Sequence, residues 1–119
     1  MPGRVNEALP DPDLRVAVER RAGQAVVSVS GELDLATADR FTEVVGPELA
    51  QGPVVLDLAG LAFLDSSGVA ALDVLVGEAG RVGHRLTVAP DLRDHVRQVL
   101  MLTGMLDALR VPGRPGPAG

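Results

Sequence analysis

The sequence predicts an α/β fold in which a small mixed sheet, an N-terminal hairpin plus parallel strands, is covered by about three to four helices. Two patterns support this prediction. Two runs of alternating apolar residues occur within residues 14–30, separated by a turn that contains Gly23. After residue 53 the order is strand, helix, strand, helix, which favours parallel pairing with right-handed crossovers.

The first two strands are predicted to pair as the hairpin. Leu14–Glu19 and Ala25–Ser30 each alternate apolar and polar side chains, as half-buried strands do. Residues 1–13, which precede them, contain three prolines and no apolar period. We therefore expect a disordered N-terminal tail before the first strand.

A helix is expected after the hairpin, beginning near Ala36 or Thr37. Its apolar stripe consists of Phe41, Val44, Val45 and Leu49. The dipeptide Gly46-Pro47 lies inside this stretch, and proline removes one helical hydrogen bond and clashes with the preceding turn. We therefore expect a kink here, or two short helices.

The remaining elements complete a domain that is expected to span residues 14–111. In chain order the pattern predicts a central strand at Val54–Leu58, a helix that ends near Ala79, a turn at Gly80–Gly83, a strand at Leu86–Ala89, a last helix that begins at Pro90-Asp91 with Asp91 as its N-cap, and a short edge strand at Leu106–Val111. Gly104 is placed to end the last helix. Residues 112–119 are rich in proline and glycine, so we expect a disordered C-terminal tail.

The composition fits one domain and excludes several classes of function. A chain of 119 residues suffices for a single domain that buries about two thirds of its unfolded surface. The net charge of −5 opposes direct binding to a nucleic-acid backbone. No apolar run approaches the ~20 residues that span a bilayer, the start lacks the apolar segment of a signal peptide, and cysteine is absent. We expect a cytoplasmic protein that does not contact a membrane.

The segment Asp65–Gly68 (Asp-Ser-Ser-Gly) lies where a strand is predicted to pass into a helix. It is followed, at the spacing of one helix face, by Val69, Leu72, Val76 and Ala79. The first N–H groups of a helix are unpaired and carry partial positive charge, which suits a phosphate that is bound or attached to a serine. The same residue types also cap helices, and on spacing alone a simple cap at Asp65 or Ser66 is the favoured interpretation.

Three blocks of the sequence resemble the signatures of the STAS domain family, specifically of its anti-sigma factor antagonists. The blocks are Gly31–Ala38 (GELDLATA), Asp65–Gly68 (DSSG) and Val99–Asp107 (VLMLTGMLD), and they occur in the family's order. The resemblance covers about residues 14–110. It implies a STAS-type small mixed sheet, which agrees with the pattern of strands and helices described above.

The resemblance also implies a phosphorylation site. In the antagonists the first serine after the aspartate accepts the phosphate, which corresponds to Ser66, and Ser67 is the alternative acceptor. By the same resemblance, Asp34, Asp65, Ser67 and Gly68 belong to the partner-facing surface. For Asp34, a simple cap on the helix that begins near Thr37 is an equally good interpretation.

The partners follow from the resemblance as well. An unphosphorylated antagonist binds an anti-sigma factor, often a serine kinase of the histidine-kinase-like ATPase type, and so frees a sigma factor for transcription. A PP2C-type serine phosphatase reverses the phosphorylation. ATP and Mg²⁺ belong to the kinase, so no cofactor is expected for this chain. The alternative function is a non-switching STAS scaffold or accessory subunit, in a stressosome-like or lipid-transport complex.

Catalysis by the chain itself is not expected. A serine nucleophile needs a base to take its proton, and the only histidines, His84 and His95, are predicted to be surface residues. Two separated histidines without cysteine give no metal-ligand spacing. Asp57 stands among apolar residues of the central strand, where we expect it to face the end of the sheet or to pair with an arginine.

Overall fold

The computed structural model describes residues 13–109 of the chain. Within them lie β1 (Leu14–Arg21), β2 (Gln24–Leu33), α1 (Ala38–Gln51), β3 (Val54–Leu64), α2 (Ser66–Val82), β4 (Leu86–Val88), α3 (Asp94–Leu102) and α4 (Met105–Leu109). The expected disordered tails lie outside the described residues, apart from Asp13, and so does the predicted end of the domain at residue 111.

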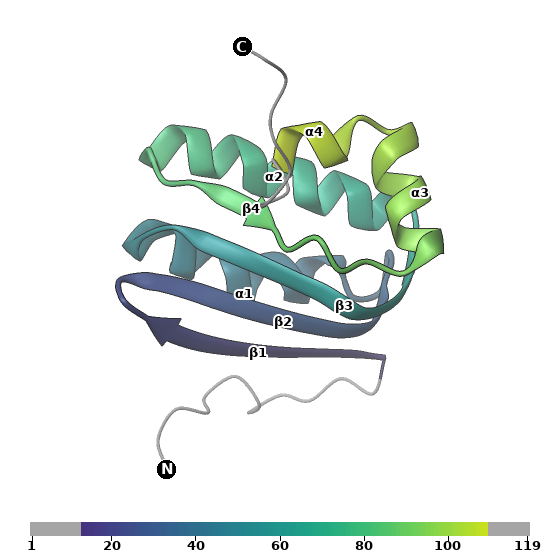
Figure 1. The fold of residues 1–119 in the computed structure, drawn as a ribbon, viewed down its shortest axis with the longest axis horizontal. Coiled ribbons are helices and arrows are strands. Elements are labelled where there is room, and N and C mark those ends of the chain that lie inside the picture. The colour runs from purple at the N-terminus through teal and green to yellow at the C-terminus, as the bar shows by residue number, and fades with distance from the viewer. Residues whose placement is uncertain (1–12, 110–119) are drawn as a thin grey trace.

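The strands form one mixed sheet in the order β1-β2-β3-β4 (Figure 1). β1 pairs antiparallel with β2, while β2–β3 and β3–β4 are parallel pairs. The hairpin closes at Arg21 and Gln24 through a two-residue turn, in which Ala22 and Gly23 both have positive φ, 51° and 84°. Such turns match the natural twist of paired strands. The predicted α/β class and the N-terminal hairpin are therefore confirmed.

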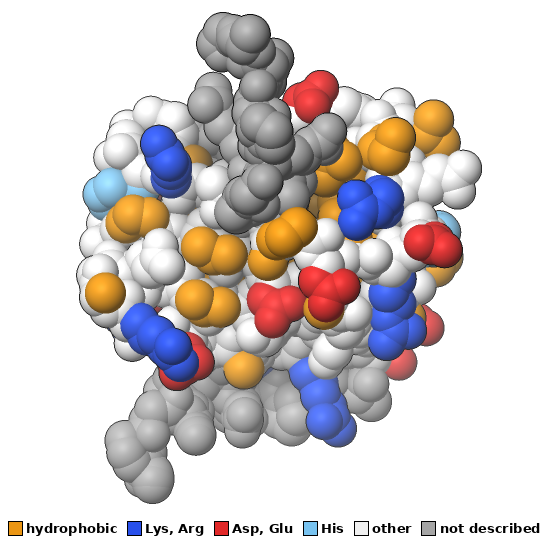
Figure 2. All heavy atoms as spheres, in the orientation of Figure 1, with side chains coloured by type: hydrophobic (Ala, Val, Ile, Leu, Met, Phe, Trp, Pro, Cys, Tyr) orange, Lys and Arg blue, Asp and Glu red, His pale blue; other side chains and the backbone are white. Residues whose placement is uncertain are grey.

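The two long helices, α1 and α2, lie side by side on one face of the sheet (Figure 1). Between helices and sheet is an almost wholly aliphatic core, in which Phe41 is the only buried aromatic side chain among the described residues. Phe41, Val45 and Leu49 of the predicted stripe are buried, whereas Val44 is only half-buried. On the sheet face turned toward the viewer, apolar, basic and acidic side chains are interspersed (Figure 2).

Helix α1 runs without interruption through Pro47, so the predicted division into two short helices is wrong. Pro47 lies on the exposed side of α1, and so does Glu43, whose carbonyl is the one that loses a helical hydrogen bond. Water can satisfy a carbonyl on that side. The burial of Phe41, Val45 and Leu49 on the opposite side holds the helix together as one unit.

Strand β3 and helix α2 are both longer than predicted. β3 continues through Leu64, so a single residue, Asp65, connects it to α2 where a longer loop was expected. The helix continues to Val82, and Gly83 ends it in the left-handed conformation, φ 78°. The turn predicted at Gly80–Gly83 is therefore the last part of α2 and its cap.

The C-terminal part differs from the prediction in two elements. Helix α3 begins at Asp94, with Arg93 at its N-cap position, so Asp91 is not the N-cap. Leu92 is buried ahead of the helix, which holds the preceding segment against the core in an irregular conformation. Gly104 ends α3 as predicted, with φ 79°. The edge strand predicted from Leu106 is instead helix α4, which buries Met105, Leu106 and Leu109 at helical spacing.

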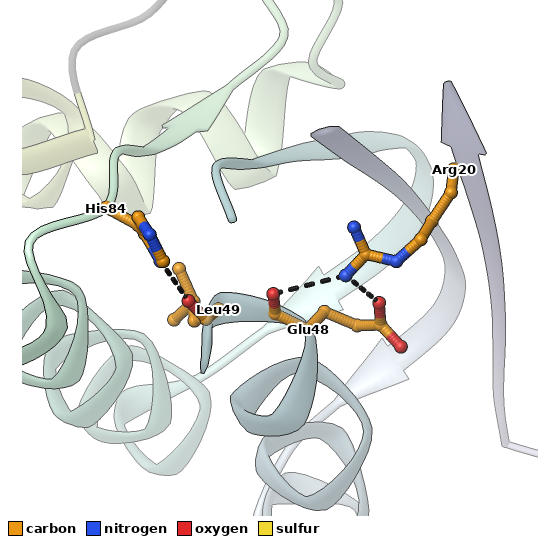
Figure 3. Close-up of polar contacts among 4 residues, drawn as sticks. All are labelled: Arg20, Glu48, Leu49 and His84. Atoms are coloured by element: carbon orange, nitrogen blue, oxygen red, sulfur yellow. Dashed lines mark hydrogen bonds and ion pairs between the residues drawn. The ribbon is translucent and has the colours of Figure 1, made fainter. Parts of the chain in front are cut away.

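Polar contacts tie the elements together at the end of the sheet where β3 begins (Figure 3). Arg20 of β1 pairs with Glu48 of α1 at 2.6 Å and also donates to the Glu48 carbonyl at 3.3 Å. His84 Nδ1 lies 2.6 Å from the Leu49 carbonyl oxygen, and this contact leaves His84 half-buried, where an open surface position was expected. This end is therefore a structural one, and the candidate site lies at the opposite end.

Candidate functional site

The strands β2 and β3 end next to one another, and an aspartate follows each end. Leu33 of β2 is paired with Leu64 of β3, so Asp34 and Asp65 emerge at the same edge of the sheet. The Asp65 N–H donates to the Leu33 carbonyl at 3.4 Å, which continues the contact beyond the strands. The register of β2 against β3 thus places both aspartates at one end of the sheet.

Asp65 is the N-cap of α2. Its Oδ1 accepts hydrogen bonds from the Ser67 N–H at 2.9 Å and the Gly68 N–H at 3.1 Å, and its carbonyl accepts from the Val69 N–H at 3.0 Å. A carboxylate in this position satisfies otherwise unpaired amides and lies favourably in the field of the helix dipole. The capping interpretation is thus correct for Asp65 but not for Ser66.

Ser66 is the first residue of α2 and its side chain is exposed, whereas Ser67 is half-buried. Within residues 13–109 no hydrogen-bond partner holds the Ser66 hydroxyl. Because Asp65 supplies the cap, this hydroxyl has no structural task at the helix start. Of the two serines, Ser66 therefore presents the more accessible oxygen to another protein.

Gly68 is buried where α2 meets the end of β2. A Cβ atom at this position would lie 2.6 Å from the Leu33 carbonyl oxygen and 2.6 Å from Leu64 Cδ1. Both distances are far below ordinary van der Waals contact, so the first turn of α2 can approach the strands only with glycine here. The close approach at Gly68 is therefore made by atoms of this chain, the Leu33 backbone and the Leu64 side chain.

Asp34 braces the turn between β2 and α1. Its Oδ1 accepts a hydrogen bond from the Ala36 N–H at 3.0 Å, and its own N–H donates to Thr37 Oγ1 at 3.0 Å. The Thr37 hydroxyl donates to the Glu32 carbonyl at 2.9 Å, and Thr37 is the only buried polar residue among those described. Asp34 therefore braces the turn before α1 but is not the N-cap, which is Thr37 without a side-chain cap hydrogen bond, so the capping interpretation of Asp34 is wrong. Its half-buried side chain borders the edge that carries Ser66.

The surroundings of Ser66 are acidic and partly apolar. Glu32 is exposed opposite Phe63 in the strand register, and Asp34 and Asp65 are half-buried beside it. Leu35 is 80% exposed and Phe63 is 40% exposed at the same edge. Exposed leucine and phenylalanine next to an accessible serine are a suitable docking surface for another protein.

His95 has contacts at this edge that the sequence did not predict. Its Nε2 accepts a hydrogen bond from the Leu64 N–H at 3.4 Å, and its ring stacks on Phe63 with centroids 5.4 Å apart. His95 is an exposed residue, as expected, but it is not without contacts. No sequence signal could have found them, because residues 63 and 95 meet only in the folded chain.

Other chemistry has little support in the part of the chain that the structure describes. It contains no group of three or more His, Asp or Glu side chains placed to hold a metal ion. The Asp57 carboxylate accepts a hydrogen bond from the Ala59 N–H at 3.1 Å, so it braces its own strand. Farther along α2, a hydrogen bond from Arg81 lowers the pKa of Glu78, which is a surface effect away from Ser66. None of the described helices is long and apolar enough to cross a membrane.

Comparison with known proteins gives a consistent result. The sequence model of the STAS domain family matches residues 15–114. The anti-sigma-F factor antagonist RsfB of Mycobacterium tuberculosis is 33% identical over 101 residues, which are 82% of this chain and 80% of RsfB.

Solved structures agree. The crystal structure of an anti-sigma factor antagonist from Mycobacterium paratuberculosis is 30% identical, with a TM-score of 0.73 over 87% of this chain and 90% of that one. SpoIIAA in its unphosphorylated form, an anti-sigma factor antagonist, shares the fold at 22% identity, with a TM-score of 0.67 over 78% of this chain and 84% of that one.

Proposed function

This chain belongs to the STAS domain family, and we propose that it is an anti-sigma factor antagonist controlled by phosphorylation of Ser66. Two similar proteins, RsfB and the Mycobacterium paratuberculosis protein, are described as anti-sigma factor antagonists. They are 33% and 30% identical to this chain over most of their length. The observation that carries the proposal is the state of Ser66: it is exposed at the first position of α2, and Asp65 has taken over the cap.

The unphosphorylated protein binds an anti-sigma factor through the edge formed by the ends of β2 and β3. Asp34 and Asp65 lie at that edge, and Leu35 and Phe63 are exposed there. Ser67 and Gly68 take part by holding the first turn of α2 in place. Binding of the anti-sigma factor releases a sigma factor for transcription.

Phosphorylation ends this binding for an electrostatic reason. A phosphate adds about −1.5 to −2 charges at pH 7. Asp65 already occupies the Ser67 and Gly68 amides, so these N–H groups cannot neutralise the new charge. A partner surface fitted to a neutral serine then faces desolvation and like-charge costs, and a hundredfold loss of affinity corresponds to only ~2.7 kcal/mol.

The chemistry of the switch belongs to the partners. The kinase is the anti-sigma factor itself, of the histidine-kinase-like ATPase type, and a PP2C-type serine phosphatase removes the phosphate. This chain acts as substrate and ligand and not as an enzyme. In support, neither histidine is placed to activate Ser66: the His95 Nε2 is engaged by the Leu64 N–H, and His84 lies at the other end of the sheet.

The test of the acceptor is intact mass and peptide mapping after incubation with the anti-sigma kinase and ATP. We expect one phosphate on the wild-type protein, located on Ser66. Ser66→Ala should take up none, and Ser67→Ala should retain most of the incorporation because its Ser66 is intact. Phosphate found mainly on Ser67, His84 or His95 would contradict the assignment.

A further inference from the structure

The side of β3 that faces away from β2, its outer edge, has different neighbours along the length of the strand. β4 pairs only with Val54–Leu56, and the last hydrogen bond on that side runs from the Ala89 N–H to the Leu56 carbonyl at 2.8 Å. From there to Leu64 no strand of the described part of the chain lies beside this edge of β3. The irregular segment that follows β4 runs along it to helix α3, which packs against β3 (Figure 1). A helix cannot continue the ladder with its own backbone, so the free groups of β3 need side-chain partners or water.

Two side chains at the start of α3 meet this need. Arg93 Nε donates to the Ala59 carbonyl at 3.3 Å, and His95 Nε2 accepts from the Leu64 N–H at 3.4 Å. The Asp65 N–H reaches the Leu33 carbonyl on β2, while the preceding N–H, that of Leu64, points toward α3. The N-cap residue of α3, Arg93, thus serves as a donor for the free edge, and His95 within α3 serves as an acceptor.

The contact of His95 requires one form of the ring. An Nε2 that accepts a hydrogen bond carries no proton, so the contact needs the neutral tautomer with its proton on Nδ1. The imidazole plane lies at 16° to the plane of Phe63, so the nitrogen lone pairs, which lie in the ring plane, are kept nearly parallel to the Phe63 ring. A protonated ring has two donors and cannot accept from Leu64.

We propose that His95 is a positioning residue for the Ser66 site, acting through the Leu64 amide as a neutral acceptor that ties α3 to the end of β3. Leu64 immediately precedes Asp65, the cap of α2, so the tie holds the residue on which the position of Ser66 depends. The expected effect on recognition of Ser66 by a kinase rests on the proposed function. The tie itself does not depend on any partner.

Protonation of His95 should therefore loosen the site. The charged groups near the ring are Glu32, which lies opposite Phe63 in the register, Asp65 beyond Leu64, and Arg93 and Asp94 on α3. A pH dependence could arise from any of these carboxylates as well as from His95. A variant that removes only the titration of His95 separates the two sources.

The experiment measures amide hydrogen exchange of Leu64 by NMR, as a protection factor corrected for the intrinsic effect of pH. His95→Phe keeps a ring against Phe63 but lacks the acceptor, and the protection of Leu64 should fall by roughly fivefold, the loss of one ordinary hydrogen bond. In His95→Gln the side-chain oxygen can accept, so protection should be largely restored. His84→Gln, the same change at the other end of the sheet, is the matched control and should leave Leu64 unchanged.

The pH profile distinguishes positioning from simple packing. In the wild type, protection of Leu64 should be lower in samples whose ring resonances show His95 to be protonated than in samples that show it neutral. In His95→Gln that dependence should vanish. A dependence that persists would belong to the carboxylates and would overturn the proposal, as would unchanged Leu64 protection in His95→Phe.

The link to Ser66 is measured with the anti-sigma kinase. The kcat/KM for phosphorylation should fall in His95→Phe by about as much as the protection of Leu64 and recover in His95→Gln. Equal kcat/KM in all three proteins would overturn the positioning role. A wild-type protein that takes up no phosphate would contradict the proposed function instead, and the exchange data alone would then decide whether His95 holds Leu64.

Discussion

Asp65, Ser66 and Gly68 have three different roles within the first turn of α2. Asp65 caps the helix, Ser66 presents a free hydroxyl, and Gly68 allows the helix to approach Leu33. The sequence predicted a cap at Asp65 or Ser66, because an aspartate and two serines before an apolar helical period are a strong helix-start signal. The phosphorylation site was implied only by the resemblance to the STAS antagonists. The sequence alone could not decide between Asp65 and Ser66 as the cap, because that choice depends on the direction of the chain where β3 ends.

Gly68→Ala should destabilise the protein, because its Cβ would meet the Leu33 carbonyl, a backbone atom that cannot move alone. We expect a loss of about 1–3 kcal/mol in the free energy of unfolding, measured by urea denaturation. Gly77→Ala in the same helix is the control. A Cβ there meets nothing within 4 Å, and the change should stabilise by roughly 0.5–1 kcal/mol. Equal effects of the two changes would contradict the close packing at Gly68.

Asp65→Ala should remove the cap of α2 and lower the free energy of unfolding by about 1 kcal/mol. Asp65→Asn keeps an oxygen for the Ser67 and Gly68 amides and should lose less. Ser66→Ala should change stability by no more than ~0.5 kcal/mol, because its hydroxyl has no partner within the described chain. Thermal or urea unfolding of the three variants tests this order, and a Ser66→Ala loss as large as that of Asp65→Ala would refute the capping assignment.

Helices and strands that depend on residues close in sequence were predicted more accurately than those that depend on contacts between distant residues. β1 and the starts of β2, α1 and α2 were predicted closely, because apolar period and local turn residues determine them. The end of β3, the start of α3 and helix α4 were not, because they depend on pairing with Leu33, on the burial of Leu92 and on packing of Leu106 and Leu109. Those contacts join residues that are distant in sequence.

Pro47→Ala tests the continuity of α1. Pro47 lies inside an uninterrupted helix on its exposed side, so alanine should restore a backbone hydrogen bond without disturbing the core. Proline in a helix interior costs up to ~3 kcal/mol relative to alanine, and we expect the variant to be more stable by at least about 1 kcal/mol in urea denaturation. A less stable variant would show that α1 needs the proline for its packing.

At the scale of the whole molecule, the two ends of the sheet have different tasks. One end is closed by the Arg20–Glu48 ion pair and the His84–Leu49 contact, which join β1 and the segment after α2 to α1. The other end carries the accessible Ser66, the two aspartates and exposed apolar side chains. The mixed α/β class could be predicted from the order in which strand-like and helix-like apolar periods follow one another in the sequence. Which polar residues share an end required the register of β2 against β3.

The account of a phosphorylation-controlled antagonist is tested most directly by calorimetric titration of the purified anti-sigma factor with this protein in its unphosphorylated and Ser66-phosphorylated forms. Circular dichroism of both forms should be the same, because Asp65 caps α2 in either state. We expect the unphosphorylated protein to bind and the phosphorylated protein to bind at least about a hundredfold more weakly, a difference of ~2.7 kcal/mol. Equal affinities of the two forms would contradict the switch.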